Sequence, residues 1–463
     1  MALIDIETFV IVILENRSFD HMCGYLSLPD AGPPMPVDGL QADPAWIDRY
    51  RNDDIDGTPR SLHRLPPTVQ NIIDPPHEDD VIAMQIGTPT HGAAAPILGG
   101  FVKSYATAKQ QPADRSPVMG YYSKEAVPVF DFFARNFAIC DRWFSPLPAG
   151  TQANRLMAMG GESHIHHNVS NPLEFPDQKL VYDWLEEIPS ERTKAGPLRW
   201  CSYQWGGLPF FALMQRWWGR IMGGLNDFRQ TGLFRHYEKF AEHWNGDDDL
   251  IPDVVFIEPK YTDDPTSPFR APCDDHCPTG ITEGQKFLAH IYNTIISNKE
   301  RWKSTMMIVT YDEHGGFFDH VPPPEVPTLA GGNGFKTTGV RIPAFVISPY
   351  VKPGSVFHDT VDTTSILHLL AERYTPGEPY SDAVQARQQF FKPLSAILDN
   401  DPMTNDPAPI PASVLDGLSH GAPAARHDTG EPTPTATAFD RVAAAMAKMH
   451  PDQFVNPFPI GTV

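Results

Sequence analysis

The sequence predicts an α/β protein with a mostly parallel central sheet flanked by helices, and three features of the sequence carry this prediction. Residues 8–14, 252–259 and 305–310 are short apolar runs rich in β-branched residues, which is typical of strands buried on both faces of a sheet. Between the last two runs, residues 282–297 place apolar side chains at helical spacing. Strands that alternate with helices in this way form parallel sheets.

The remaining elements follow the same pattern. An amphipathic helix is predicted over residues 127–136 and a short buried strand over 137–141. Residues 342–349 form an apolar run that ends at a proline, and residues 363–373 repeat the amphipathic helical spacing. Residues 27–75 are rich in Pro, Asp and Arg and show little periodicity, so we expect a long surface excursion there.

The length of 463 residues allows one large domain with insertions as well as two or three average domains. We predict a main domain over residues 1–395 and a peripheral extension over 396–463. Within the main domain, residues 165–250 hold most of the tryptophans and are predicted to form an insertion or cap over the sheet. These rings either pack a small core or contact an apolar or choline-like substrate through cation–π attraction.

The bulk composition limits partners and location. A net charge of −21 disfavours nucleic acid as a partner and electrostatic docking on anionic membranes. No apolar run approaches the ~20 residues of a transmembrane segment, and no signal peptide is recognisable. We therefore expect a cytoplasmic protein, or a secreted or periplasmic one if a leader was removed. The five cysteines predict no disulfide framework, which leaves pairing of Cys273 with Cys277 open.

The central motif of the chain follows the run 305–310. Asp312 and Glu313 stand side by side where this strand ends, and Gly315 and Gly316 then break the regular structure. Two adjacent carboxylates at a buried strand end repel each other unless a cation lies between them. The motif therefore predicts a metal site.

The N-terminal strand ends in a second pair of oxygen ligands, Glu15 and Asn16. Ligands bind outside the carboxyl ends of the strands in a parallel α/β sheet. We therefore expect this pair to meet Asp312 and Glu313 at one edge of the sheet. The four oxygen ligands favour one divalent cation of the hard type, Ca²⁺ or Mg²⁺, and leave Zn²⁺ open.

A possible nucleophile lies in the middle of the chain. Pro148 and Gly150 predict a turn, and Thr151 then falls at the start of a helix that carries Asn154 and Arg155. A hydroxyl at this position commonly caps the first backbone N–H groups. It also suits a nucleophile that attacks a phosphate held by those same N–H groups. The spacing alone leaves both roles open.

Four histidines lie near these motifs. His77 precedes a predicted helix that starts near Val81, and His276 follows the strand 252–259 on a loop. Taken singly, each is an ordinary loop histidine. His314 and His320 close the central motif.

The segments 15–21 (Glu-Asn-Arg-Ser-Phe-Asp-His) and 312–320 (Asp-Glu-His-Gly-Gly-Phe-Phe-Asp-His) together resemble a bacterial phosphoesterase family. This family contains phospholipases C and AcpA-type acid phosphatases, and plant non-specific phospholipases C are also members. Both motifs are long, occur in the family's order, and extend the resemblance over residues 5–395. The resemblance implies an alkaline-phosphatase-like α/β fold, which agrees with the strand pattern.

The resemblance also implies a role for each motif residue. The family's metal ligands fall on the pairs Glu15–Asn16 and Asp312–Glu313. Its nucleophilic hydroxyl falls on Thr151, although Ala153 replaces the family's proline. The implied histidine and substrate-binding positions are His77 in the motif Asp74-Pro-Pro-His77, His276 with Cys277 inserted after it, His314, His320, Asn154 and Arg155.

The implied function is a metal-dependent phosphoric ester hydrolase of the phospholipase C type. In this mechanism Thr151 attacks phosphorus in line, while His77, His276, His314 and His320 hold the phosphoryl oxygens or protonate the leaving alcohol. His314 has a structural role as its alternative. The substrate would be a small phosphoester or a phospholipid with a phosphocholine-like head group. An acid phosphatase and a non-catalytic, metal-stabilised binding protein are the alternatives, and the oligomeric state stays open.

Overall fold

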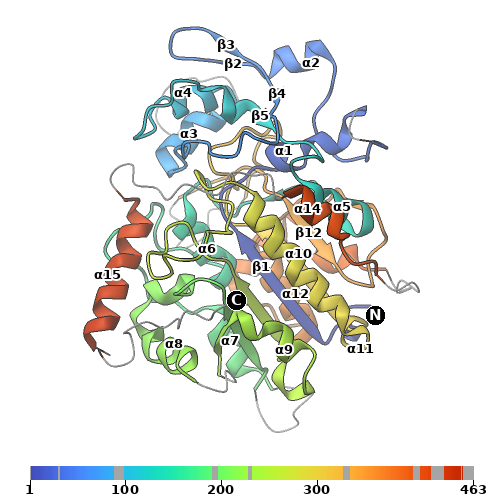
Figure 1. Cartoon of the computed structure of the whole chain (residues 1–463), viewed down its shortest axis with the longest axis vertical. Helices are drawn as coiled ribbons and strands as arrows, with labels where there is room; N and C mark the ends of the chain where they lie inside the picture. The colour runs from blue at the N-terminus through green and yellow to red at the C-terminus, as the bar shows by residue number, and fades with distance from the viewer. Residues whose placement is uncertain are drawn as a thin grey trace.

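The computed structural model describes residues 2–29, 32–87, 98–189, 197–227, 232–326, 334–399, 407–418, 432–449 and 451. Within these residues, eight strands form a central sheet in the order β13-β6-β12-β11-β1-β10-β8-β9 (Figure 1). Their bounds are β1 (Thr8–Leu14), β6 (Ala138–Cys140), β8 (Trp200–Gln204), β9 (Phe234–His236), β10 (Val254–Glu258), β11 (Thr305–Tyr311), β12 (Ala344–Ile347) and β13 (Ser355–Phe357). β12 is antiparallel to both neighbours, and the other pairings are parallel. The predicted α/β fold with a mostly parallel sheet is confirmed.

The register of the two central strands positions the site. β1 pairs with β11 from Thr8 opposite Thr305 to Leu14 opposite Tyr311. Every residue of both strands is buried, because helices cover both faces of the sheet and the side chains are almost all apolar. The residues that follow Leu14 and Tyr311 therefore leave the sheet together at its carboxyl edge.

Helices pack on both faces of the sheet (Figure 1). α5 (Pro128–Asn136) and α10 (Thr282–Ser297) contact each other on one face, and α6 (Thr151–Gly160) and α12 (Ser365–Tyr374) contact each other on the opposite face. The other helices beyond residue 180 are α7 (Val181–Glu187), α8 (Trp218–Leu225), α9 (Phe240–Trp244), α11 (Lys299–Trp302), α13 (Asp382–Gln388), α14 (Ala412–Gly417) and α15 (Pro434–Met449).

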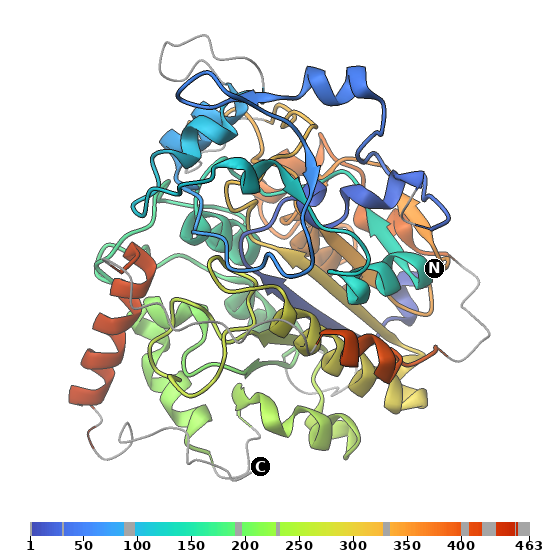
Figure 2. The ribbon, with the colours of Figure 1, turned by 45° about the horizontal axis from the view of Figure 1, so that its top comes forward.

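The part of the chain that lies over the carboxyl edge of the sheet comes from the N-terminal quarter. Figures 1 and 2 show the blue and cyan segments above the end of β1. They contain α1 (Phe19–Met22), α2 (Pro44–Arg49), α3 (Asp79–Ile86), α4 (Phe101–Tyr105) and the short strands β2 (Asn52–Asp53), β3 (Pro59–Arg60), β4 (His63–Arg64) and β5 (Gly120–Tyr121). The expected surface excursion 27–75 thus contributes to a cover over this edge.

The Trp-rich segment 165–250, predicted to be an insertion or a cap, contributes two strands to the central sheet. Its strands β8 and β9 pair with β10 and extend the sheet at one edge. The sequence Trp-Cys-Ser-Tyr-Gln of β8 lacks a β-branched aliphatic run, and β9 has only three residues. The periodicity therefore gives no strand signal there. The rings of Trp200, Trp217 and Trp244 are buried in the core. The boundary at residue 395 stays a prediction.

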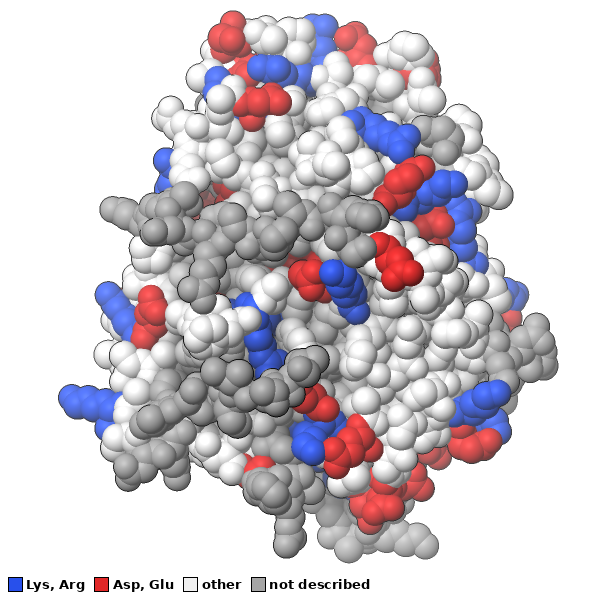
Figure 3. Space-filling view, viewed as in Figure 1, with Lys and Arg blue, Asp and Glu red and all other residues white. Residues whose placement is uncertain are grey.

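Two further observations concern the surface and the thiols. No helix in the described ranges has the length and apolarity needed to cross a bilayer. Figure 3 shows basic and acidic side chains interspersed over the drawn face. All five cysteines are buried free thiols, so Cys273 and Cys277 are not paired in this structure.

Candidate active site

The two predicted ligand pairs lie side by side at the carboxyl edge of the sheet. The backbone N–H of Asn16 donates to Oδ1 of Asp312 at 3.3 Å, and the N–H of Arg17 donates to the carbonyl of Glu313 at 3.1 Å. Asn16 has a φ of 68°, a left-handed conformation that Asn tolerates better than most residues. Glu15, Asn16, Asp312 and Glu313 are at most 2% exposed. The structure therefore brings the four predicted ligands together.

The orientation of the Asn16 amide tests whether these residues fit a cation. With its nitrogen toward the carboxylates, the amide donates to Asp312 Oδ1 at 3.1 Å and to Glu313 Oε1 at 2.7 Å. With its oxygen there, the amide oxygen accepts from the Thr151 hydroxyl at 3.5 Å and faces two carboxylates. In this second orientation buried oxygens converge, and a cation between them would compensate their negative charge. The donor set fits a divalent cation and does not identify it.

Arg155 supplies part of the positive charge at this edge. Its Nε donates to Asp312 Oδ2 at 3.3 Å and its Nη2 to Glu15 Oε1 at 3.4 Å. Further donors reach the Tyr261 hydroxyl and the carbonyls of Ile13 and Leu14. Burial raises the pKa of Asp312 well above its usual range, and the guanidinium opposes that rise. These contacts make Arg155 a partner of the acidic residues, and its predicted role in substrate binding stays a prediction.

The turn before α6 presents Thr151 to the acidic residues. Gly150, not Thr151, occupies the N-cap of α6 and makes no side-chain cap. The Thr151 hydroxyl instead points to the Asn16 amide, so the capping role considered from the sequence is wrong. The Asn154 side chain accepts from the Leu147 N–H at 2.8 Å and donates to the Ala149 carbonyl at 2.6 Å. Asn154 thereby fixes the turn, while its predicted contact with substrate stays untested.

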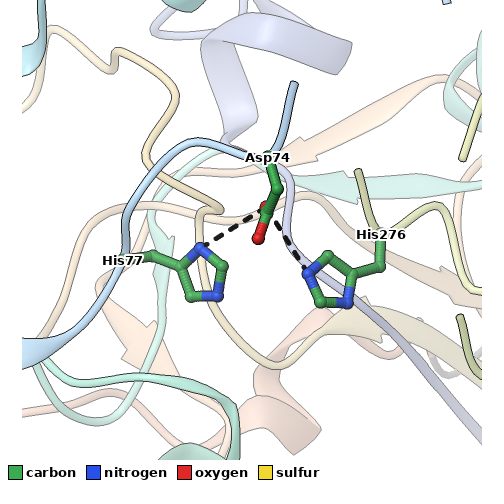
Figure 4. Close-up of side chains that lie close together, drawn as sticks. All are labelled: Asp74, His77 and His276. Carbon is green, nitrogen blue, oxygen red and sulfur yellow. Dashed lines mark ion pairs between the residues drawn. The ribbon is translucent and has the colours of Figure 1, made fainter. Parts of the chain in front are cut away.

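His77 and His276 face each other across Asp74 (Figure 4). Asp74 Oδ1 lies 3.8 Å from His77 Nδ1 and 3.5 Å from His276 Nε2. Nδ1 of His276 lies 3.1 Å from Glu15 Oε2, and Nε2 of His77 lies 3.9 Å from Glu313 Oε1. The structure therefore joins both predicted histidines to the predicted metal ligands.

The neighbouring carboxylates raise the pKa of both rings. Burial would lower the pKa of His77, but Glu313 and Asp74 raise it to about 9. Burial also opposes the charge on His276, whereas Asp74 and Glu15 raise its pKa well above the usual value. Burial acts to raise the pKa of Asp74, but the nearby rings of His77 and His276 lower it below its usual value.

Two acidic residues of this cluster were not among the predicted site residues. Asp74, His77 and His276 bring ligand atoms within 4.8 Å of one another, as do Glu15, Asp274 and His276. Burial, with Glu15 adding to it, raises the pKa of Asp274 to about 7. The signal for Asp74 is in the motif that contains His77. Asp274 belongs to an acidic pair directly before His276, and this pair is the signal in the sequence for it.

His314 links the central motif to the N-terminal cover. Its Nδ1 lies 3.2 Å from Glu313 Oε2, and its Nε2 lies 2.8 Å from Oε1 of Gln85 on α3. Both ring nitrogens thus contact protein groups, which favours the structural alternative for this residue. Gln85 was missed because a single glutamine in an amphipathic helix gives no signal in the sequence.

His320 belongs to a second cluster. Its Nδ1 lies 2.7 Å from Asp20 Oδ2 and its Nε2 lies 3.3 Å from Asp38 Oδ1. Arg341 binds Asp20 at 3.1 Å and Asp319 at 2.8 Å in the same cluster. Burial opposes the charge of His320, but Asp20 and Asp38 raise its pKa to about 9. These partners differ from those of Thr151, so we assign His320 no part in the reaction proposed below.

Comparison with known proteins finds phospholipases C among the relatives of this chain. The chain is 30% identical over 375 residues to non-specific phospholipase C4 of Arabidopsis thaliana, a match that covers 76% of this chain and 63% of that protein. Non-specific phospholipase C3 of the same plant is 32% identical, with coverage of 76% and 65%. Phospholipase C B of Mycobacterium tuberculosis (strain ATCC 25618 / H37Rv) is 27% identical, with coverage of 80% and 74%. The chain thus spans less than two thirds of these plant relatives.

One solved structure that aligns with this chain is described as a protein of the alkaline phosphatase superfamily from Vibrio parahaemolyticus. The alignment covers 70% of this chain and 81% of the chain in that structure. The TM-score is 0.33 and the sequence identity 12%. The model of the Phosphoesterase family matches residues 6–375, a range that includes every residue of the site described above. This chain therefore belongs to the Phosphoesterase family.

Proposed function

We propose that this chain is a metal-dependent phosphoric ester hydrolase of the phospholipase C type, which cleaves phosphodiesters that carry a phosphocholine-like head group. The observation that carries the proposal is the contact of the Thr151 hydroxyl with Asn16, at the edge where four buried oxygen ligands converge. The relatives named phospholipase C support the choice of a diester.

One divalent cation would be held by Glu15, Asn16, Asp312 and Glu313. Their oxygen ligands favour Ca²⁺ or Mg²⁺ and leave Zn²⁺ open. When bound, such a cation stabilises negative charge on oxygen as a Lewis acid. Because Thr151 opens α6, the positive end of the helix dipole lies at this residue and would stabilise the negative charge of phosphoryl oxygens.

The proposed reaction uses Thr151 as the nucleophile. Its Oγ1 loses its proton to solvent and forms a bond to phosphorus as the bond from phosphorus to the leaving alcohol breaks, which leaves the phosphorylated head group esterified to Thr151 until water hydrolyses that ester. His77 and His276 carry protons near neutral pH and lie within the same cluster. One of them protonates the leaving oxygen, and the other binds a phosphoryl oxygen. Proton donation of this kind is worth roughly 10²–10⁴-fold.

One feature of the site favours an acid phosphatase as the second candidate. Two charged rings, His77 and His276, would stabilise the dianion of a phosphate monoester better than the single charge of a diester. A non-catalytic binding protein does not need the contact between the Thr151 hydroxyl and the Asn16 amide.

A single assay separates these candidates. Hydrolysis of p-nitrophenylphosphocholine and of p-nitrophenyl phosphate is measured after EDTA treatment and after addition of Ca²⁺, Mg²⁺ or Zn²⁺. We expect the diester to have the higher kcat/KM and EDTA to abolish turnover reversibly. A higher kcat/KM for the monoester would make the protein an acid phosphatase, and no release of p-nitrophenol under any metal would overturn the hydrolase proposal.

A further inference from the structure

Helix α15 lies outside the range 6–375 that the family model matches, yet it contacts the wall of the candidate site. Figures 1 and 2 show it along the flank of the molecule, in red. We propose that α15 is a positioning element of the active site, which holds Arg155 and the first turn of α6 against the metal ligands. This inference rests on the proposed function for its catalytic consequence and on the contacts below for its structure.

The first contact runs through aromatic rings. Phe439 is fully buried, and its ring stacks on Tyr261 with 6.3 Å between centroids and 20° between planes. Its edge meets Phe210 at 6.1 Å. The guanidinium carbon of Arg155 lies 5.2 Å from the ring centroids of both Phe210 and Tyr261. The two rings that hold Arg155 are therefore themselves packed against α15.

Arg155 transmits this packing to the metal ligands. Its Nη1 donates to the Tyr261 hydroxyl at 3.2 Å, while its Nε and Nη2 reach Asp312 and Glu15. The donors of a guanidinium are fixed in one plane, so a shift of the Tyr261 ring turns the donors on Asp312 and Glu15 as well. The hydrogen bonds of Arg155 therefore carry the effect of this packing to the two carboxylates.

The second contact reaches the nucleophile helix. Gln152, the residue after Thr151, donates from Nε2 to the Thr435 hydroxyl at 3.2 Å. The Thr433 hydroxyl donates to Asp263 Oδ2 at 2.7 Å, on the loop that follows Tyr261. The start of α15 therefore joins the first turn of α6 to the loop that carries Tyr261. A helix that only covered apolar surface would need neither hydrogen bond.

The chain offers a matched pair of variants on α15. Phe439 and Met446 are both fully buried, and Met446 lies two turns further along the helix, about 10 Å from Phe439. Phe439→Ala and Met446→Ala both remove a large apolar side chain from the same helix. We expect Phe439→Ala to lower kcat for p-nitrophenylphosphocholine at least tenfold with little change in KM, and Met446→Ala to stay within twofold of the wild type. Assays are run well below the lowest Tm.

Hydrogen exchange gives a readout that needs no turnover. In the full-length protein, peptides that cover residues 151–156 and 258–263 should exchange faster in Phe439→Ala than in the wild type, and Met446→Ala should leave them unchanged. Equal effects of the two variants on exchange and on kcat would overturn the proposal. Faster exchange at an unchanged kcat would overturn it too.

A milder variant tests the proposal even if Phe439→Ala fails to fold. Thr435→Val removes the hydrogen bond to Gln152 and keeps the volume of the side chain, and we expect a two- to fivefold loss of kcat. If the wild type releases no p-nitrophenol, the proposed function fails. The exchange comparison then decides alone whether α15 positions Arg155.

Discussion

The Arg155 guanidinium donates to the Asp312 carboxylate at 3.3 Å, although 157 residues separate the two in the chain. This contact ties α6, the helix that begins at Thr151, to the end of β11. It also makes Arg155 a compensating charge for Asp312 and Glu15 within the protein itself. The consequences for stability follow from the burial of all three groups.

Replacement of Arg155 by Met should destabilise the fold by about 3–5 kcal/mol, because it leaves buried carboxylates without their positive partner. The loss should be largest in EDTA, since a bound cation would compensate the same carboxylates. Urea unfolding with and without Ca²⁺ measures both effects. Arg64→Met is the control, because its ion pair with Glu125 is more than 40% exposed on both sides and is worth about 0–1 kcal/mol. Equal losses in the two variants would contradict the assigned role.

Thr151→Ala should lower the turnover rate by at least about 10³-fold, as expected for the loss of a nucleophile. The unfolding midpoint should change little, because Gly150 and not Thr151 occupies the N-cap of α6. Thr151→Ser keeps the hydroxyl and should retain measurable turnover with the same metal requirement. Single-turnover kinetics with p-nitrophenylphosphocholine compares the three proteins. Activity of Thr151→Ala near that of Thr151→Ser would exclude Thr151 as the nucleophile.

The stability conferred by His320 should depend on pH. Its pKa of about 9 lies above that of an unfolded histidine, about 6.5. The contribution is therefore complete below pH ~6.5 and is lost as the pH rises through 9. The shift corresponds to about 3 kcal/mol, and the side chain is only 7% exposed.

His320→Gln should accordingly be less stable than the wild type at pH 6, and the difference should shrink by pH 9.5. Asp20 and Asp38 raise the pKa of His320 and Arg341 opposes them, so the variant leaves Asp20 to Arg341 and Asp38 to Arg142. Unfolding in guanidinium chloride at several pH values from 5.5 to 9.5 measures the free energy of unfolding of both proteins. His164→Gln changes an exposed histidine and is the control. Its free energy of unfolding should change with pH as that of the wild type does. A constant difference between His320→Gln and wild type across this range would refute the assignment.

The part of the site that lies on the two central strands is predictable from the sequence. An apolar run that ends in Glu15–Asn16 and another that ends in Asp312–Glu313 specify two buried parallel strands, and their ligands must then share one edge. His320 shows where this reasoning stops. It lies only seven residues after Glu313, yet its partners Asp20 and Asp38 come from the N-terminal segment. Local spacing carries no information on which distant segment covers a loop.

The position of the cover could not be predicted for a related reason. Residues 27–75 and the segment 165–250 both lack clear periodicity, so the sequence did not distinguish a cover from a sheet edge. The difference lies in strand pairing, because β8 pairs with β10 in the sheet. The N-terminal part of the chain instead lies over the site, where Gln85 contacts His314 and His77 lies near Glu313. Such tertiary contacts override weak local patterns.

Gly315 allows the two ligand pairs to approach each other, and its substitution tests the geometry of the site. Its φ is +64°, and a Cβ at this position would lie 2.2 Å from the carbonyl oxygen of Asn16. Gly315→Ala therefore adds a backbone clash to the cost of a left-handed alanine, about 1 kcal/mol. Gly57→Ala isolates that second cost, because Gly57 has a φ of +81° and open space around its Cβ.

Gly315→Ala and Gly57→Ala should differ both in stability and in cation binding. Gly315→Ala should lose clearly more stability than Gly57→Ala in urea, because Asn16 must move away from Asp312 and Glu313 to make room for the methyl group. The same displacement should weaken binding of Ca²⁺ or Mg²⁺ by calorimetry, whereas Gly57→Ala should bind as the wild type does. If both variants bind the cation equally well, Asn16 is not held against the carboxylates as the ligand geometry requires.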